Sequence, residues 1–407
     1  MKRYSWPDGH WRWPIELTHH HGVRSGHLVF TGGQADLDQN GCVVHPNDLQ
    51  AQSQSVISFV ENILIDLDTS TDDVVRWVVY FVGNADDEAY ILSQLSKATA
   101  DQCRPTVSTI CLPALCYPGM RIELEAVAWC SGKDSNGLKV AKPQYARGDN
   151  LCALPDSFSH AVRCDDLVFT SDCSAMSSSG EVLEPNNLLA QTHLMMQSMA
   201  STLELVGASM NDALKLNVFY KGDGTAESWG EPALVRASHF DDPGPAATGI
   251  AVPGFAVPGL MTKIAATAGL QTNSVDCEYS WPENHWDWTE KLPYKHGNRF
   301  GKLIHLGGQV ALDKEAKVLH PHDMVEQTRI AMKNIELVLA DLGATLDDVI
   351  KVTTFYQGNA SAEALHENLL IRSASYTKPG PATSGIPVTH LVYESMVIEI
   401  EVIAQLD

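Results

Sequence analysis

The sequence predicts an α+β protein built from three copies of one domain, each with a mixed sheet and two helices on one face. The segments 105–128, 245–268 and 381–404 each open with proline and a small or β-branched run, and each ends in strand-like alternation. Their spacings of 140 and 136 residues are domain lengths rather than solenoid repeats. The elements between these segments also recur in one order, which favours helices gathered on one side of each sheet.

Each copy opens with strands and turns, and a capped helix follows. The start signals of this helix are the polar triplets at 46–48, 185–187 and 321–323. A β-branched and aromatic strand comes next and is expected to be buried. A second helix, such as 363–376 in the third copy, precedes the closing strands. The buried strands are expected at 74–81, 213–220 and 349–356.

Polar, unpatterned stretches separate the copies and are expected to be linkers. The predicted domains are 1–135, 136–273 and 274–407. The first and third also carry matching tryptophan-rich arms at 5–13 and 280–288, which the second lacks. Two indoles beside a histidine could hold a planar ligand, but packing of each arm on its own domain is the favoured interpretation, because aromatic side chains supply much of a core.

The composition of the chain narrows the classes of partner and the compartment that are expected for it. The formal net charge of −22 argues against nucleic acid and anionic membranes, which both reward basic patches. No apolar run approaches the length of a membrane span, and the N-terminus lacks the apolar stretch of a signal peptide. Nine cysteines without a Cys-x-x-Cys motif favour free thiols and a cytoplasmic protein. The histidine spacings match no metal motif, so no metal and no cofactor is assigned.

Equivalent positions of the copies carry candidate functional residues. His296 and its counterparts His21 and His160 each precede a strand, where a hydrogen-bonding structural role is favoured over catalysis. After that strand, Gly33 and Gly308 belong to Gly-Gly-Gln segments that allow close backbone approach. The second copy has Ser171, Asp172 and Cys173 in place of these three residues.

The ordered set of motifs resembles the Rid family, the YjgF-type reactive-intermediate deaminases, over most of all three copies. The motifs are the segments 30–34, 121–126, 307–309, 381–384 and 397–401, together with Gln52 in the first helix. Members of that family are typically trimers of one-domain chains with ligand clefts between subunits. The resemblance therefore implies three Rid-like (chorismate-mutase-like) domains that form an intramolecular pseudo-trimer, present as a monomer or a dimer of it.

The resemblance also implies site residues. Glu123 and Glu399 match a strand glutamate that the family places near a catalytic water. Tyr294 matches the ring-stacking tyrosine, and Asn368 matches the helix asparagine. The family arginine that grips a substrate carboxylate is absent, because Thr383 and its two counterparts stand in its place. The counterparts are Val107 and Ala247. Ordinary 2-iminopropionate-type deamination is therefore expected to be lost, unless another cation such as Arg121 has taken over.

The second copy differs most from the family pattern. Besides Asp172 and Cys173, it has Lys263 where the other copies have the strand glutamate. Two interpretations stay open. Lys263, Asp172 and Cys173 could form a rebuilt catalytic site, in which the lysine acts as a base or amine and the cysteine as a nucleophile. Alternatively, Lys263 and Asp172 form a buried ion pair that fills an abandoned cleft.

The sequence therefore predicts a hydrolase or deaminase that acts on a small C=N or enol(amine) metabolite in an inter-domain cleft. The alternatives are a chorismatase-like hydrolase or lyase, and a non-catalytic small-molecule binder or regulatory scaffold. Retention of Tyr294, Asn368 and Glu399 in one copy favours an enzyme whose working cleft involves the third copy. Loss of the arginine in all copies favours the alternatives.

Overall fold

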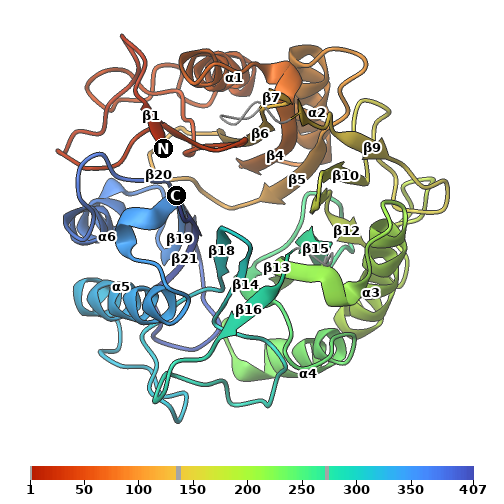
Figure 1. Ribbon diagram of the computed structural model, residues 1–407, viewed down its shortest axis with the longest axis vertical. Helices are drawn as coiled ribbons and strands as arrows, with labels where there is room; N and C mark the ends of the chain where they lie inside the picture. Colours follow the sequence, from red (N-terminus) through yellow and green to blue (C-terminus); the bar gives the residue numbers. More distant parts are fainter. Residues whose placement is uncertain (1, 134–138, 271–274) are drawn as a thin grey trace.

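The computed structural model describes residues 2–133, 139–270 and 275–407. These residues form three large mixed sheets arranged around one axis, with the long helices on the outside (Figure 1). Each sheet with its helices is one Rid-like domain, here called the first, second and third domain. The two domain boundaries predicted from the sequence fall within 134–138 and 271–274, outside the described residues.

The first domain shows the strand order that the other two repeat. Its elements are β1 (Arg3–Ser5), β2 (Gly22–Ser25), β3 (Leu28–Thr31), α1 (Leu49–Asp66), β4 (Val74–Phe81), α2 (Ala85–Ala98), β5 (Thr106–Cys111) and β6 (Ile122–Trp129). The sheet order is β1-β2-β3-β6-β4-β5, in which β4 and β5 are parallel and the other neighbours antiparallel. A short hairpin of β7 (Gly132–Lys133) and β8 (Lys139–Val140) follows.

The second and third domains repeat this order. The second contains β9 (Gln144–Ala146), β10 (Ala161–Cys164), β11 (Leu167–Thr170), β12 (Cys173–Ser174), α3 (Leu188–Glu204), β13 (Ala213–Lys221), α4 (Ala226–Ala237), β14 (Ala246–Val252) and β15 (Thr262–Gly269). The third contains β16 (Cys277–Ser280), β17 (Gly297–Phe300), β18 (Leu303–Leu306), α5 (Met324–Asp341), β19 (Val349–Gln357), α6 (Ala362–Ala374), β20 (Ala382–Val388) and β21 (Ile398–Gln405). The predicted helices and central strands are therefore confirmed to within about two residues.

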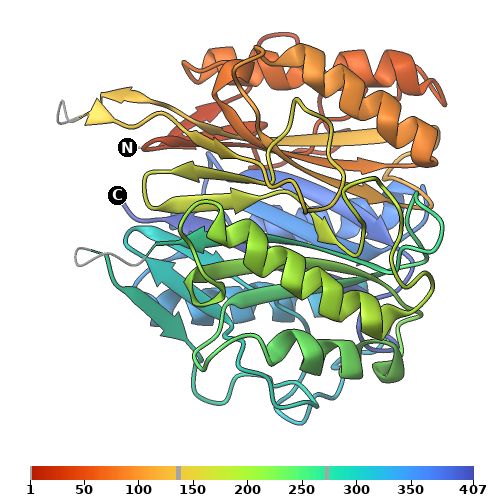
Figure 2. The ribbon, with the colours of Figure 1, turned by 90° about the vertical axis from the view of Figure 1, so that its right-hand side faces the viewer.

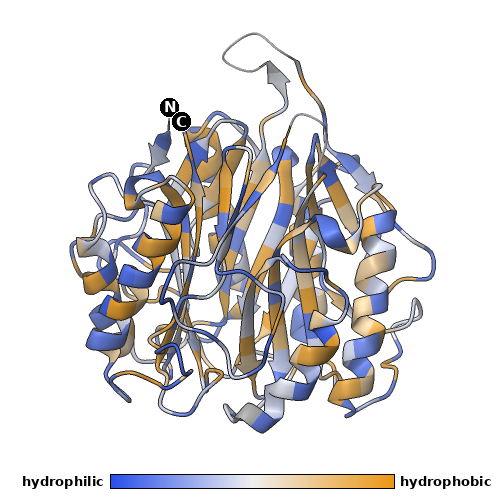
Figure 3. Ribbon diagram, turned by 60° about the horizontal axis from the view of Figure 1, so that its bottom comes forward, coloured by the Kyte–Doolittle hydropathy of each residue, from blue (hydrophilic) through white to orange (hydrophobic). Residues whose placement is uncertain are grey.

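The long helices start where the sequence predicted. The side chains of Asp48, Asn187 and Asp323 each accept hydrogen bonds from backbone N–H groups of the first helical turn. Apolar residues concentrate on the strands and on the inward faces of the helices (Figure 3). Figure 2 shows the same arrangement from the side, with helices outside and the sheets facing inward.

A buried glutamine ties each long helix to the start of the closing strand, which carries Glu123, Lys263 or Glu399. In the third domain Gln327 donates from Nε2 to the Ser395 carbonyl (3.0 Å) and accepts at Oε1 from the Val397 N–H (2.9 Å). Gln52 and Gln191 make the equivalent pairs of bonds in the other domains. The start of β21, and with it Glu399, is thereby fixed relative to α5.

Among the described residues, no helix combines the length and the apolar character that a membrane span requires.

We expect the chain to be a monomer in solution, or at most a dimer, because its own three domains already close the ring (Figure 1). Light scattering coupled to size-exclusion chromatography should give the mass of one or two chains. A species with the mass of three chains would contradict the expectation.

Candidate functional site

Three equivalent backbone hydrogen bonds join neighbouring domains and define three clefts. The N–H of Gly308 donates to the Ala247 carbonyl at 3.1 Å, which joins the third domain to the second. Gly33 and Thr383 make the same contact between the first and third domains (3.0 Å). The corresponding bond between the second and first domains runs from Asp172 to Val107 (3.2 Å). The clefts are called 2–3, 1–3 and 1–2 after the domains they separate.

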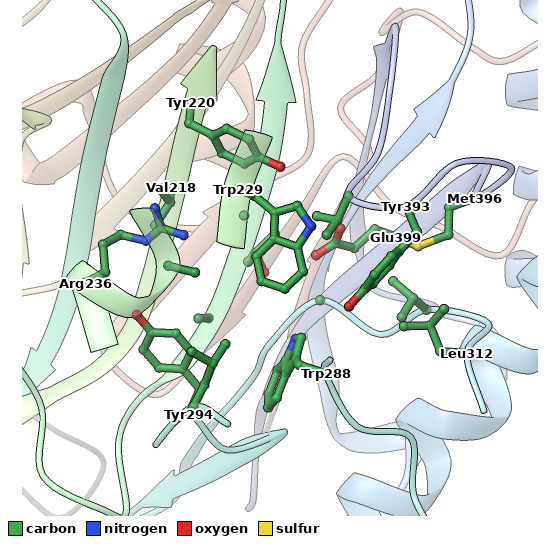
Figure 4. A pocket seen from close by; sticks show the side chains of 18 of the residues that line it. Val218, Tyr220, Trp229, Arg236, Trp288, Tyr294, Leu312, Tyr393, Met396 and Glu399 are labelled. Carbon is green, nitrogen blue, oxygen red and sulfur yellow. The ribbon is translucent and has the colours of Figure 1, made fainter. Parts of the chain in front are cut away.

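The 2–3 cleft contains a pocket of about 680 Å³ (Figure 4). Its wall is aromatic on both sides, and it includes the residue that stands at the family's arginine position, Ala247. The aromatic lining residues are Tyr220, Trp229, Trp286, Trp288, Tyr294 and Tyr393. An aromatic lining with a few polar groups is typical of small-molecule sites.

Glu399 is the carboxyl group of this pocket. It lies on β21, and its carboxyl packs directly on Gly308, where a Cβ atom would come within 1.8 Å of Glu399 Oε1. The Gly-Gly-Gln segment is thus needed for the glutamate to reach its place. Burial raises the pKa of Glu399 to about 8, while Lys215 opposes the shift and Glu401 adds to it. At neutral pH the group is therefore protonated and can donate a proton.

Arg236 is a cation in the pocket that the sequence analysis did not identify. It lies on α4 at the position of Arg372 on α6. Arg372 gives its Nε and Nη2 protons to Asn368 Oδ1 (3.0 and 2.9 Å). In α4 that asparagine is replaced by Pro232, which offers no side-chain acceptor. Arg236 is consequently left without that partner and lines the pocket (Figure 4).

Several buried polar atoms of the pocket lack a hydrogen-bond partner within the described residues. They are Arg236 Nη1, Trp229 Nε1 and the Tyr220 hydroxyl. The Tyr294 hydroxyl interacts with the Arg236 guanidinium. Burial raises the pKa of the Tyr294 phenol, and the Arg236 guanidinium opposes that shift. Unpaired buried donors are costly, so their convergence on one cavity indicates a site shaped for a polar ligand or ordered water.

The tryptophan-rich arm packs on its own domain and also supplies part of the pocket wall. Trp286 Nε1 donates to Gln309 Oε1 (3.2 Å), and Trp288 stacks on His296 with 5.2 Å between ring centroids. His296 Nε2 donates to the Trp286 carbonyl (2.9 Å). This histidine therefore lies behind the arm rather than on the pocket wall, which consists of Trp286 and Trp288 on this side. His21 and His160 hold the equivalent segments through the carbonyls of Trp11 and Cys152.

The 1–3 cleft brings together Glu123 and Gly33 of the first domain with Thr383 of the third. Its pocket is smaller, about 350 Å³. Burial raises the pKa of Glu123 to about 8, with Glu125 adding to the shift. The third domain's Arg372 is held here by Asn368, and its Nη1 donates to Thr383 Oγ1 (3.0 Å). The guanidinium is thus already partnered within the protein.

The 1–2 cleft is occupied by a network of charged side chains. Lys263 Nζ lies 3.1 Å from Glu88 Oε1 on α2 and 3.8 Å from Asp172 Oδ2. Asp172 also accepts from the Thr109 N–H (2.9 Å). Burial raises the pKa of the Cys173 thiol, whose nearest bonding partner is Thr202 Oγ1 (3.6 Å). These contacts favour the ion-pair interpretation over a nucleophilic cysteine, because a thiol with a raised pKa is a poor nucleophile at neutral pH.

The ring arrangement separates residues that the sequence analysis expected to act together. Tyr294, Glu399 and Gly308 meet in the 2–3 cleft, whereas Asn368 and Thr383 of the same domain face the first domain. Arg121, the cation suggested as a replacement, donates from Nε to the Val82 carbonyl (2.8 Å) and pairs with Asp87 (3.2 Å). It does not line the pocket of the 2–3 cleft or that of the 1–3 cleft.

Residues 2–133, 139–270 and 275–407 contain no group of three or more His, Cys, Asp or Glu side chains positioned to hold a metal ion.

Comparison with known proteins agrees with an architecture of three similar domains. The family model described as Endoribonuclease L-PSP matches residues 16–130, 152–269 and 289–406. The chain therefore belongs to this family, which confirms the resemblance to the Rid (YjgF-type) proteins.

The relatives are single-domain proteins matched over about one domain of the chain. A RutC family protein of Pyrococcus abyssi is 30% identical over 112 residues, covering 28% of this chain and 85% of the relative. RutC family protein UK114 of Drosophila melanogaster is 31% identical over 112 residues, covering 28% and 78%. A mouse 2-iminobutanoate/2-iminopropanoate deaminase is 27% identical over 92 residues, covering 18% and 68%.

Among solved structures, a chorismatase matches across all but a small part of the chain. It covers 82% of this chain and 93% of its own, with a TM-score of 0.54 and 13% identity. At this identity the likeness concerns the fold alone.

Replacing Glu399 with glutamine should change stability in a pH-dependent way. The carboxyl has a pKa of about 8 in the folded chain against its ordinary value of 4.5, so the folded chain holds an extra proton between these values. Stability is therefore lost as pH rises through this window. Removing the carboxyl should therefore stabilise the fold more at pH 8 than at pH 5. The difference in stabilisation is on the order of a few kcal/mol, and Tm should rise more at pH 8 accordingly.

Thermal unfolding of wild type and Glu399→Gln at both pH values measures this difference. Glu61→Gln, at an exposed position on α1, is the matched control and should show no such pH dependence. An equal Tm change at pH 5 and pH 8 would contradict the raised pKa of Glu399.

Proposed function

We propose that the chain is a hydrolase or deaminase whose working site is the 2–3 cleft. The observation that carries the proposal is the pairing, in one aromatic pocket, of a protonated carboxyl, Glu399, with a guanidinium that has an unpartnered nitrogen, Arg236. The first can move a proton to and from substrate, and the second can hold a carboxylate. The membership of the Rid family supports a small-molecule reaction of this kind.

The substrate is a planar or ring-bearing carboxylate that contains a C=N or enol-type double bond. Figure 4 shows Arg236 and Glu399 on opposite sides of the pocket, so a substrate held by both presents its carboxylate and its reacting bond at different ends. The aromatic side chains Trp229 and Trp288 supply faces on which such a group can stack. The aromatic lining on both sides of the pocket favours a substrate that carries a ring over a three-carbon imine.

The chemistry requires one carboxyl group and one water molecule. For an imine, protonated Glu399 donates its proton to nitrogen, and the resulting carboxylate then takes a proton from a water that adds to carbon. Collapse of the addition product releases ammonia and leaves a carbonyl compound, so that C=N and water become C=O and ammonia. Burial of Glu399 favours the acid form that starts the reaction.

A second candidate uses the same groups on an enol ether. Here Glu399 protonates the terminal carbon of the double bond, water adds to the neighbouring carbon, and the hemiketal breaks into an alcohol and a ketone. The ring-sized pocket supports this chorismatase-like alternative, for which the shared fold gives the precedent. The third candidate, a binder without catalysis, needs the same pocket but no proton transfer by Glu399.

Purified protein should be assayed with two substrate sets. The first comprises imines formed in situ from alanine and phenylalanine by an amino-acid oxidase, with ammonia release as the readout. The second comprises aryl enolpyruvyl ethers, with ketone release as the readout. Ring-bearing substrates should react well above the three-carbon imine, because Ala247 supplies no guanidinium close to the reacting carbon. Hydrolysis of the three-carbon imine at the fastest rate would contradict the proposed substrate class.

Glu399→Gln should lower kcat/KM by roughly two to four orders of magnitude, the contribution of a positioned acid or base. Arg236→Gln should raise KM for carboxylate substrates. Glu123→Gln changes the matching glutamate of the smaller 1–3 pocket, and Lys263→Met changes the cation of the 1–2 cleft. These two serve as matched controls and should retain most of the activity.

The controls also locate the site if the proposal is wrong. Loss of activity only in a folded Lys263→Met variant would move the working site to the 1–2 cleft. Full activity in Glu399→Gln, with Tm values as the folding control, would remove the acid role altogether.

The rate should also depend on pH in one direction. Because the acid form of Glu399 starts the reaction and its pKa is about 8, kcat/KM should fall above pH 8. A pH–rate profile of wild type tests this, and a rate that rises through pH 8 would contradict general-acid catalysis by this group.

A further inference from the structure

A second, central cavity of about 770 Å³ lies between the inner faces of the three sheets. All three domains line it, and it is separate in its lining from the pocket of the 2–3 cleft. Its charged lining residues are Arg76, Glu125, Asp172, Lys215, Lys351 and Glu401. The apolar part of the wall includes Phe30, Tyr80 and Phe219.

Three cations occupy equivalent positions in this cavity. Arg76, Lys215 and Lys351 are separated by 139 and 136 residues, the offsets of the repeat. Each bonds a hydroxyl on the parallel strand beside it: Lys351 Nζ lies 2.6 Å from Ser384 Oγ, Lys215 bonds Thr248, and Arg76 Nη2 lies 3.4 Å from Ser108 Oγ. The three cations therefore form one set around the axis.

Two of these cations are neutralised by the next domain. Lys351 pairs with Glu125 of the first domain (3.2 Å), and Lys215 pairs with Glu401 of the third (2.8 Å). By the same rotation, Arg76 would pair with residue 265 of the second domain. That residue is Ala265, which also lines the cavity but carries no charge. The set of three ion pairs consequently lacks one carboxylate.

Arg76 shows the consequence of this missing partner. It is 8% exposed, and among the described residues its Nε has no hydrogen-bond partner. The acidic group with the largest effect on Arg76 is Asp172, which raises its pKa against the larger lowering by burial, and Glu401 and Glu125 add smaller rises. Asp172 itself is engaged by Lys263 and by the Thr109 N–H. A buried guanidinium with a free donor is a strong site for a planar carboxylate.

We propose that the central cavity binds a small carboxylate at Arg76, in the place of the carboxylate that position 265 lacks. The ligand's two oxygens receive the guanidinium protons, as Glu125 and Glu401 receive those of the two lysines. Its apolar remainder lies against Phe219 and Tyr80. The ligand thereby joins the first and second domains and stabilises the folded chain by mass action.

The test uses the whole chain and named probes. Wild type is titrated with sodium acetate and sodium propionate, with sodium chloride at equal ionic strength as the reference. Binding is measured by isothermal titration calorimetry, and Tm is measured across the same concentrations. The carboxylates should give saturable binding and a concentration-dependent rise in Tm that chloride does not reproduce. An equal response to chloride and carboxylate overturns the proposal, because the protein would then show no preference for a carboxylate.

Two substitutions at one position separate charge from volume. Ala265→Glu supplies the missing carboxylate from the protein, so it should raise Tm without ligand and weaken acetate binding at least tenfold. Ala265→Gln adds a side chain of similar size without the charge and should not raise Tm to the same extent. Equal Tm values for the two folded variants overturn the proposal.

Two further variants keep the test decisive if the larger side chains prevent folding. Arg76→Gln should remove the part of the carboxylate-specific rise in Tm that comes from the central cavity. Arg236→Gln removes only acetate that binds in the pocket of the proposed enzymatic site, so it should leave the Arg76-dependent part of the rise in place. Loss of the rise in Arg236→Gln with retention in Arg76→Gln would place the anion in the 2–3 cleft and overturn the proposal. Failure of the proposed enzymatic function would leave these results unaffected.

Discussion

The close approach of backbone between neighbouring domains is the constraint on which the clefts depend. A Cβ atom at Gly32 would lie 2.6 Å from the Thr383 carbonyl oxygen, and one at Gly307 would lie 2.7 Å from that of Ala247. In the second domain Ser171 occupies this place, and its Oγ accepts from the Val107 N–H (2.9 Å). Each interface is therefore fixed by main-chain bonds, and side chains around this frame can change without moving it.

The three clefts differ because the side chains next to these main-chain bonds differ between the domains. In the first and third domains a glycine leaves room for the carboxyl of the strand glutamate. In the second domain Asp172 replaces the glycine and Lys263 replaces the glutamate, so cation and anion appear together. Glu88 of the neighbouring domain completes the network. A paired set of this kind is costly to break by single substitutions, because each would leave a buried charge uncompensated.

Sequence repetition made the fold and the equivalence of positions predictable. The caps of the long helices, the buried strands and the glutamates on the closing strands all follow from local pattern and a constant offset. The grouping of residues into clefts did not follow, because one domain contributes to two clefts from opposite sides. Tyr294 and Asn368 belong to one domain yet face different neighbours, and only the arrangement around the axis decides this.

The role of Arg236, the cation of the larger pocket, could not be predicted from the sequence for a similar reason. Arg236 and Arg372 are equivalent by sequence, and the offset of 136 residues was available from the start. Their different roles depend on Pro232 and on Ala247, which replace the asparagine and threonine that bind the guanidinium of Arg372.

The chain therefore contains two equivalent arginines, Arg372 and Arg236, whose surroundings differ in these two positions. Where both partners are present, the guanidinium is satisfied by the protein and the pocket is about 350 Å³. Where both are absent, a guanidinium nitrogen is left unpartnered beside a pocket of about 680 Å³. The alanine at position 247 is thus accompanied by a buried guanidinium one element earlier in the chain, on helix α4. In the proposed function this guanidinium, rather than an arginine at position 247, holds the substrate carboxylate.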